Sequence, residues 1–302
     1  MARKRKGIKI DGWVVIDKAY DMGSTKVVGK CRWLTKAQKA GHAGTLDPLA
    51  TGVLPIAFGE ATKTIPFMMD AQKTYIFTVT WGEERSTDDF EGEVINQNEV
   101  RPVAQEILDQ IPNFLGKIKQ RPPKYSAIKI DGKRAYDLAR SGAEFEIKER
   151  EVEIFSLKLL ESENEWATFE MECSKGTYVR SIGRDLAHKL GSYGYISMLR
   201  RTKVGCFGLE DTISLERLEE LVHSAPLEEW ILNVVTVLDD ILALAVTKDQ
   251  ADFLKNGSFI PRISLDPSNQ IGVTYKAMLG DKLIALCELD ENHLKPVRVF
   301  NL

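Results

Sequence analysis

The chain has 302 residues, of which 43% are hydrophobic and 28% are charged, and its net charge is −3. This composition can supply a real core for one large domain, or for a large domain and a small one, and no apolar run approaches the roughly 18 residues of a membrane span. The four cysteines form no CxxC pair, which favours a reducing compartment and argues against a zinc knuckle. We therefore expect a cytoplasmic protein that does not cross a membrane.

The net charge conceals an uneven distribution. Residues 1–80 carry 13 Lys and Arg against 6 Asp and Glu, residues 115–140 carry 8 against 2, and residues 171–205 carry 7 against 2. Residues 206–302, in contrast, carry 8 against 16. One basic segment is most simply a solvated surface, but three that meet in the fold would form a phosphate-binding face.

The first hundred residues contain several well-marked elements. Residues 12–18 predict a short buried strand, and Ser24 or Thr25 is expected to cap the helix that follows. The next elements are expected to be a loop, a strand, a helix interrupted at Pro66, a clear strand and a polar turn, at 36–52, 53–58, 60–69, 73–82 and 86–92.

The rest of the chain mixes helices and strands without strict alternation. Helices are expected at 103–111, 134–142 and 215–222, strands at 152–160, 166–173 and 195–206, a turn at Asp131-Gly132, and a strand, a tight turn and a helix between 175 and 190. This mixture indicates an α+β fold with a largely antiparallel sheet. From about residue 245 the chain turns acidic, and one helix with three short strands predicts a small β-rich domain there.

The segment 41–52 stands out because three glycines, a proline and two threonines surround a single carboxylate, Asp47. An Asp-Pro pair alone is usually a turn, but a plain turn does not need three glycines and a histidine. A carboxylate held in this way could be a nucleophile, a general base or a metal ligand. Metal binding is the weakest of these, because Asp17 and Glu60 have no ligand spacing to Asp47.

Two further segments place an aromatic residue beside a cation. Lys73 and Tyr75 fall on one face of a strand, where Tyr75 is either core packing or a stacking surface for an extracted base. Tyr178 and Arg180 are likewise expected to share a strand face. If Arg180 points into the same cleft as Asp47, it would keep that carboxylate ionised and oriented.

The remaining histidines and tryptophans carry weaker signals. His42 lies in the glycine-rich segment and could contact a phosphate or a base edge, whereas His188 and His223 sit in helical patterns and are expected to be structural. Trp13 and Trp33 are most simply core residues.

Three of these motifs, in this order, resemble the TruB family of bacterial tRNA pseudouridine synthases, which act on uridine 55 of the T arm. They are Gly41-His42-Ala43-Gly44-Thr45-Leu46-Asp47-Pro48-Leu49-Ala50-Thr51-Gly52, Lys73-Thr74-Tyr75 and Gly176-Thr177-Tyr178-Val179-Arg180-Ser181. The resemblance covers roughly residues 10–205. It implies a pseudouridine synthase fold with a mixed, mostly antiparallel sheet around a central cleft, a catalytic domain at 10–235 and a small C-terminal domain at 245–302.

The same resemblance implies the roles of the site residues. Asp47 would be the catalytic carboxylate, paired with Arg180, and Tyr75 would stack on the flipped uracil. His42 would contact the RNA loop, and Tyr178 and Leu199 would line the uracil pocket. The reaction implied is the isomerisation of uridine to pseudouridine in tRNA without a metal or cofactor, by a chain that we expect to act as a monomer.

The chain departs from the family pattern at two places, and two other functions compete with the one implied by the resemblance. Family members often have Lys-Pro after the first strand, where this chain has Lys18-Ala19, and the C-terminal segment is too acidic to predict strong phosphate contacts. A non-catalytic RNA-binding or tRNA-folding protein on the same fold is the main alternative. A glycosidase would need a second, paired acidic residue, and no motif supplies one.

Overall fold

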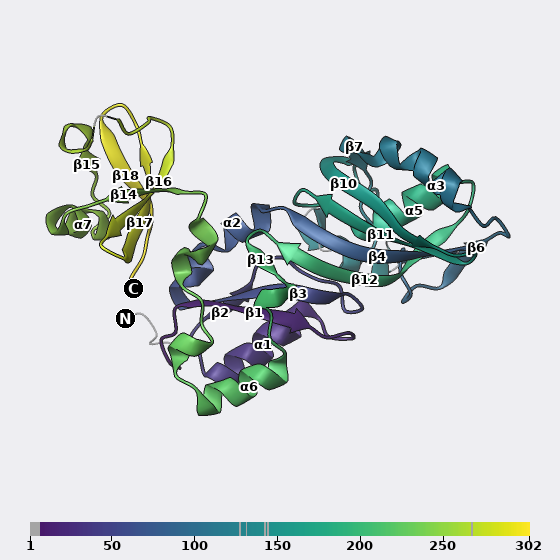
Figure 1. The fold of residues 1–302 in the computed structure, drawn as a ribbon, viewed down its shortest axis with the longest axis horizontal. Coiled ribbons are helices and arrows are strands. Elements are labelled where there is room, and N and C mark those ends of the chain that lie inside the picture. The colour runs from purple at the N-terminus through teal and green to yellow at the C-terminus, as the bar shows by residue number, and fades with distance from the viewer. Residues whose placement is uncertain (1–6, 127, 131, 142, 144, 267) are drawn as a thin grey trace.

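The structure is a computed structural model, and it describes residues 7–126, 128–130, 132–141, 143, 145–266 and 268–302. The molecule is elongated, with one long bent sheet through most of its length and a smaller sheet at one end (Figure 1). Asp131 of the expected turn and Gly142 at the expected helix end lie outside the described residues. None of the described helices is long and apolar enough to cross a membrane.

The main sheet is built around two long neighbouring strands, β4 and β12. Its order is β1 (Gly12–Lys18), β3 (Thr51–Phe58), β12 (Gly194–Val204), β4 (Lys73–Trp81), β11 (Trp166–Cys173), β10 (Arg150–Ser162) and β7 (Gly116–Gln120), with β2 (Ala40–His42) paired to β3 and β13 (Phe207–Gly208) paired to β12. Neighbouring strands run antiparallel along this path, apart from the short parallel contact between β12 and β3. The expected α+β fold with a mostly antiparallel sheet is therefore confirmed.

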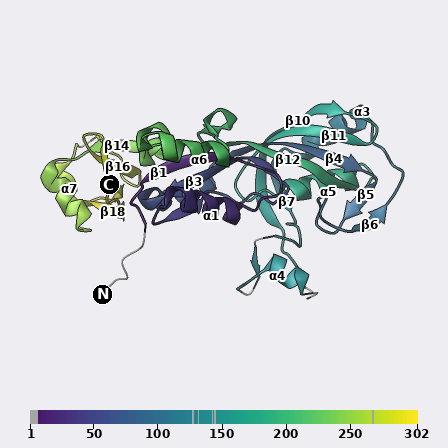
Figure 2. The ribbon, with the colours of Figure 1, turned by 90° about the horizontal axis from the view of Figure 1, so that it is seen from below.

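The chain forms seven α-helices among the described residues, most of which pack beside the main sheet. They are α1 (Ser24–Thr35), α2 (Ile65–Asp70), α3 (Ala104–Gln110), α4 (Ala135–Arg140), α5 (Val179–Lys189), α6 (Leu215–Ser224) and α7 (Lys248–Lys255), joined by 3₁₀ turns at Gly59–Lys63, Ile111–Phe114, Leu209–Asp211, Leu227–Glu229, Val234–Leu238 and Arg262–Ser264. Two small hairpins complete this part of the chain, β5 (Glu83–Arg85) with β6 (Val94–Gln97) and β8 (Lys129–Ile130) with β9 (Lys133–Arg134). Helix α4 projects away from the body of the molecule (Figure 2).

The C-terminal sheet has its own core. Its strands follow the order β14 (Leu242–Ala245), β16 (Thr274–Leu279), β17 (Lys282–Leu289), β18 (His293–Val299) and β15 (Ile260–Pro261), so β14 and β15 add to the three strands expected from the sequence. Helix α7 packs on this sheet through Ala251 and Leu254. A separate apolar cluster, which includes Trp13, Leu286 and Phe300, joins it to the main sheet.

Several local expectations were wrong. Gly23 occupies the N-cap of α1, and the Ser24 hydroxyl is used elsewhere, since it bonds the backbone of Leu46. The segment 36–52 is not all loop, because β2 pairs with β3. Trp33 is 67% exposed, because it lies on the outer face of α1 with the Lys30 ammonium 4.6 Å from its ring centre, whereas Trp13 is fully buried as expected.

The segment around Arg180 also differs from its predicted form. Residues 175–178 form a turn rather than a strand, and α5 begins at Val179, so Tyr178 and Arg180 do not share a strand face. Two features explain the difference. Gly176 adopts a φ of +82°, and the Gln120 side chain accepts from the Tyr178 N–H at 2.8 Å and donates to the Tyr178 carbonyl at 3.1 Å. The turn therefore places Arg180 in the first turn of a helix.

Candidate active site

The loop between β2 and β3 holds Asp47 in place through its backbone. The Ser24 hydroxyl accepts from the Leu46 N–H at 2.8 Å and donates to the Leu46 carbonyl at 2.9 Å. One residue beyond Asp47, the Pro48 carbonyl accepts from the buried Lys18 ammonium at 2.9 Å. The backbone on both sides of the carboxylate is thus fixed by buried side chains, as a preorganised site requires.

A buried arginine on β12 braces the same loop from the other side. Arg201 is 1% exposed and donates to the carbonyls of Val53 at 2.8 Å and Gly44 at 3.1 Å. Gly52 has a φ of +101°, and a Cβ there would lie 2.1 Å from the Arg201 carbonyl oxygen. Only glycine lets β3 pass so close to β12, which accounts for one glycine of the frame.

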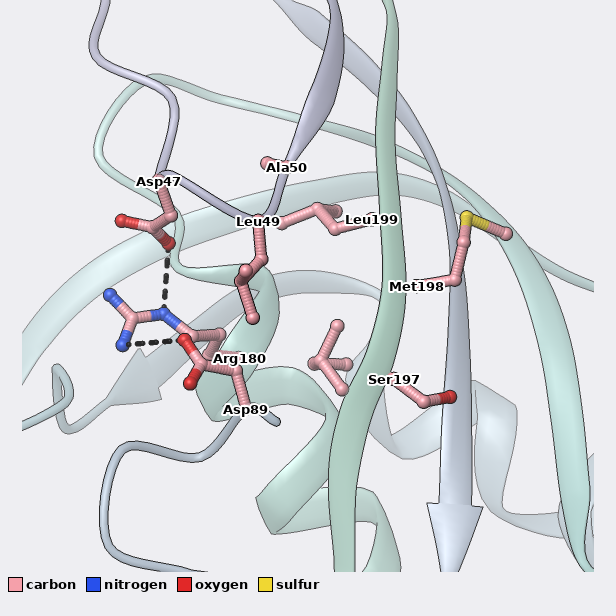
Figure 3. Close-up of a pocket in the computed structure, with 9 residues that line it drawn as sticks. Asp47, Leu49, Ala50, Asp89, Arg180, Ser197, Met198 and Leu199 are labelled. Atoms are coloured by element: carbon pink, nitrogen blue, oxygen red, sulfur yellow. Dashed lines mark ion pairs between the residues drawn. The ribbon is translucent and has the colours of Figure 1, made fainter. Parts of the chain in front are cut away.

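Arg180 lies against the Asp47 carboxylate, as its expected pairing requires. Its Nε is 2.9 Å from Asp47 Oδ2, and its Nη1 is 3.4 Å from Asp89 Oδ2, so the guanidinium bridges two carboxylates (Figure 3). The Nε–H is not aligned as a hydrogen bond to any group of the described chain, so its contact with Asp47 is a charge contact. Burial alone would lower the pKa of Arg180, but Asp47 and Asp89 raise it above its usual value.

Apolar and aromatic side chains surround this charged pair. Leu49 lies beside Asp47 in the close-up, Leu199 reaches toward Leu49 from β12 (Figure 3), and all three line the same small pocket. Tyr75, on β4, and Tyr178, before α5, line the larger cleft into which Asp47 opens. Burial raises the pKa of Tyr75, so its phenol stays protonated at neutral pH. A planar group in this cleft would meet aromatic and aliphatic side chains next to the Asp47 carboxylate.

The cleft is large and carries both signs of charge. Its volume is about 1310 Å³, more than the roughly 300–1,000 Å³ of ordinary small-molecule pockets, so it suits part of a larger substrate. Each of the three basic segments contributes a cation to its lining, among them Lys26, Arg140 and Arg201. The three segments therefore meet around the site, where Lys26 and Arg140 are exposed to phosphates, whereas Arg201 is buried and bound to backbone carbonyls.

His42 stands apart from this group. It lies in β2 and is not among the residues that line the cleft. Its Nδ1 is buried and meets no hydrogen-bond partner in the described part of the chain, and burial together with the charge of Arg201 lowers its pKa. The contact predicted between His42 and RNA stays a prediction.

Two charged residues that complete the site, Asp89 and Arg201, were not predicted from the sequence. The only sequence signals were the paired acids of the polar turn at 86–92 and the paired arginines in the strand that follows Tyr195. Among the described residues, no three His, Cys, Asp or Glu side chains are grouped so as to hold a metal ion. The charged groups at Asp47 are instead arranged as an arginine between two aspartates.

Sequence comparisons connect the whole chain with one family. Residues 32–179 match the N-terminal domain of the TruB family of pseudouridylate synthases, and residues 180–243 match the C-terminal domain described for tRNA pseudouridylate synthase B. The tRNA pseudouridine synthase B of Caulobacter vibrioides is 51% identical over 312 residues and covers 100% of both chains. That of Sinorhizobium medicae is 50% identical over 305 residues, which covers 99% of this chain and 98% of the relative.

Solved structures share the fold at much lower identity. A structure of an H/ACA RNP bound to a substrate RNA containing 2′-deoxyuridine superposes with a TM-score of 0.75 at 19% identity, covering 100% of this chain and 92% of that one. An archaeal box H/ACA sRNP Nop10–Cbf5 complex gives a TM-score of 0.74 at 19% identity, with 100% and 93% covered. These likenesses concern the fold alone.

Proposed function

Because this chain belongs to the TruB family of pseudouridylate synthases, we propose that it isomerises uridine 55 in the T arm of tRNA to pseudouridine with Asp47 as the catalytic carboxylate. Pseudouridine formation in tRNA follows from the full-length identity of 51% to a tRNA pseudouridine synthase B. The target position and the roles of individual residues are the proposal. The observation that carries it is the ion pair between Asp47 and Arg180 in a cleft lined by Tyr75.

The chemistry needs one carboxylate and a base held outside its stack. The N1–C1′ bond of uridine breaks, the uracil rotates, C5 joins C1′, and the proton on C5 leaves while N1 gains one. The product is an isomer of the substrate, so the reaction balances without an oxidant, a reductant or a group donor. A buried target base must be extruded before any side chain reaches it.

Each site residue has a role in this scheme. Asp47 attacks the nucleoside or removes a proton from it, and Arg180 compensates its charge and fixes its direction. Tyr75 stacks on the flipped uracil, because base stacking on an aromatic ring is worth about 1–3 kcal/mol. Tyr178 and Leu199 enclose the base, and His42 contacts the RNA loop.

The division of labour along the chain is part of the same proposal. Residues 10–235 carry out catalysis, and residues 245–302 form a small domain that adds contacts to RNA. RNA loops are recognised by shape, stacking and phosphate contacts, which suits a cleft lined by aromatic and basic side chains. The protein acts on tRNA as a monomer in the cytoplasm.

The test is the substitution Asp47→Asn, assayed by tritium release from a tRNA transcript that carries uridine labelled at C5. We expect release to fall by at least ~10²-fold while tRNA binding is kept, because an amide can neither attack nor take a proton. Asp109→Asn, at an exposed position of α3, is the matched control and should keep full activity. Undiminished release from Asp47→Asn would refute the assignment.

The target position needs its own measurement. A transcript with cytidine at position 55 should release no tritium above background, and carbodiimide mapping of the wild-type product should show a single adduct at 55. If cells that contain only Asp47→Asn grow as well as wild type, the alternative role in tRNA binding or folding would be the important one for growth.

A further inference from the structure

A second arginine on α5 binds two segments that flank the site. Arg184 Nη1 donates to Asp88 Oδ2 at 2.8 Å, and its Nη2 donates to the Arg121 carbonyl at 3.0 Å. The Ser181 hydroxyl donates to that same carbonyl at 2.8 Å. Helix α5 thereby holds the turn at 86–92 and the start of the segment that leads to the projecting helix α4 (Figure 2).

Arg180 connects the same two segments one helical turn earlier. Its Nη1 donates to the Thr87 carbonyl at 2.8 Å and its Nη2 to the Tyr125 carbonyl at 3.0 Å. Residues four apart on a helix lie on one face, so Arg180 and Arg184 act side by side. Arg184 and Arg180 thus both join the turn at 86–92 to the segment 121–125. Arg180 does so beside Asp47, and Arg184 does so one helical turn further along, through its ion pair with Asp88.

The backbone of Asp88 is what lets two consecutive acids point to two different arginines. Asp88 has a φ of +61°, an unusual conformation for a residue with a side chain. Its carbonyl accepts from the Ile196 N–H at 3.0 Å, while its carboxylate faces Arg184 and that of Asp89 faces Arg180. The ion pair with Arg184 therefore helps to hold the turn in the conformation that directs Asp89 into the site.

The outer pair is well shielded from water. The side chain of Asp88 is 10% exposed and that of Arg184 is 16% exposed. Burial raises the pKa of Asp88 to about 6, against the opposing charges of Arg184 and Arg180. Removal of Arg184 leaves the buried Asp88 carboxylate without its ion-pair partner, so its neighbours shift to meet it.

We propose that Arg184 and Asp88 form a positioning pair for the pseudouridine site. Their contact fixes the turn at 86–92 and thereby the direction of Asp89. Asp89 and the Thr87 carbonyl in turn hold the guanidinium of Arg180 against Asp47. Neither member of the pair is among the residues that line the cleft, so both act through Arg180. This inference rests on the proposed function.

Asp185 provides a matched control for the pair. It also contacts Arg184, at 2.8 Å from Nη2, but both residues belong to α5, so this contact does not join the helix to the turn at 86–92. Asp185→Asn removes a carboxylate from the same guanidinium without releasing the turn. If the pair positions the turn, Asp88→Asn should slow the reaction and Asp185→Asn should not. If only the loss of charge around Arg184 matters, both variants should slow the reaction equally.

The experiment compares Arg184→Gln, Arg184→Lys, Asp88→Asn, the double variant Arg184→Gln/Asp88→Asn, and Asp185→Asn with wild type. Single-turnover tritium release with enzyme in excess gives the rate of the chemical steps, filter binding gives the tRNA affinity, and thermal unfolding gives the stability. We expect a rate loss of about 10- to 100-fold for Arg184→Gln and for Asp88→Asn with an affinity within about twofold of wild type. The double variant should lose no more than the worse single variant, and Arg184→Lys should recover part of the rate.

The outcomes separate this proposal from the function on which it rests. Wild type that releases no tritium would refute the proposed function, whereas active wild type with full rates in Arg184→Gln and Asp88→Asn would overturn only the pair. Three further outcomes would also overturn the positioning role and assign the pair to fold stability. They are an equal rate loss in Asp185→Asn, rate losses that multiply in the double variant, and loss of folding in both single variants.

Discussion

The buried ammonium of Lys18 donates a hydrogen bond of 2.9 Å to the carbonyl of Pro48, the residue that follows Asp47. It also donates to the carbonyls of Ala19 at 2.9 Å and Met22 at 2.7 Å, so its three protons are all used. Burial lowers its pKa to about 8, although the charge of Asp47 acts in the opposite direction. Lys18 thus fixes the backbone of the loop next to Asp47. It does so although Ala19 follows it in this chain, where family members often have proline.

Lys18→Met should therefore slow catalysis without weakening tRNA binding. The substitution leaves three carbonyls without their donor and frees the loop beside Asp47, and a displacement of about 1 Å can cost about 10²-fold in rate. Single-turnover tritium release and filter binding measure the two effects. Lys30→Met, on the surface of α1, is the control and should match wild type in both assays.

The strand that carries Tyr75 and the shaped loop that carries Asp47 have local sequence signals. The glycines and the proline that shape the Asp47 loop are its immediate neighbours, and the alternating pattern of β4, which is buried at Lys73 and Tyr75, is visible within nine residues. Signals of this kind depend only on neighbouring residues and not on the arrangement of distant segments, so the strand and the shaped loop could both be predicted.

Asp89 and Arg201 could not be found in this way, because they come from distant segments. Asp89 and Arg201 reach the site only when β12 lies between β3 and β4, and no local pattern records that order. The helical position of Arg180 was missed for a related reason. Thr177, Tyr178 and Val179 favour a strand by composition, but the side chain of Gln120, 58 residues away, holds the Tyr178 backbone and α5 starts after it.

Arg180→Lys should inactivate the enzyme although it keeps the charge. The guanidinium contacts Asp47, Asp89 and the Thr87 and Tyr125 carbonyls at once, and a single ammonium cannot reach all four. We expect a loss of at least ~10²-fold in single-turnover rate and a lower melting temperature. Arg217→Lys, in an exposed pair on α6, should change neither, and a rate for Arg180→Lys within about threefold of wild type would contradict the role given to its geometry.

Gly52→Ala tests the close approach of β3 and β12. The new methyl group would meet the Arg201 carbonyl oxygen at 2.1 Å in a backbone with a φ of +101°, so both the strand contact and the conformation oppose it. We expect a loss of at least ~2 kcal/mol in the free energy of unfolding, measured by urea denaturation. At Gly29 in α1 a Cβ meets nothing within 4 Å, so Gly29→Ala should instead stabilise the protein by about 0.5–1 kcal/mol.

His42 should make the fold sensitive to acid. Its pKa in the folded protein lies below the ordinary value of 6.5, because it is buried and faces the charge of Arg201. A group with a depressed pKa contributes stability that is present above its unfolded pKa and lost as the pH falls through the folded value. The folded protein therefore binds the His42 proton less readily than the unfolded chain does, so the free energy of unfolding decreases as the pH falls below about 6.5.

His42→Gln should remove that part of the pH dependence. We expect the melting temperature of wild type to fall more steeply than that of His42→Gln between about pH 6.5 and pH 5, because glutamine does not titrate. His223→Gln, at an exposed position of α6, should keep the wild-type slope. Asp88 titrates in the same window with the opposite sign but is present in all three proteins, so it cancels in the comparison. Parallel curves for wild type and His42→Gln would mean that His42 is protonated in the fold as easily as in the unfolded chain.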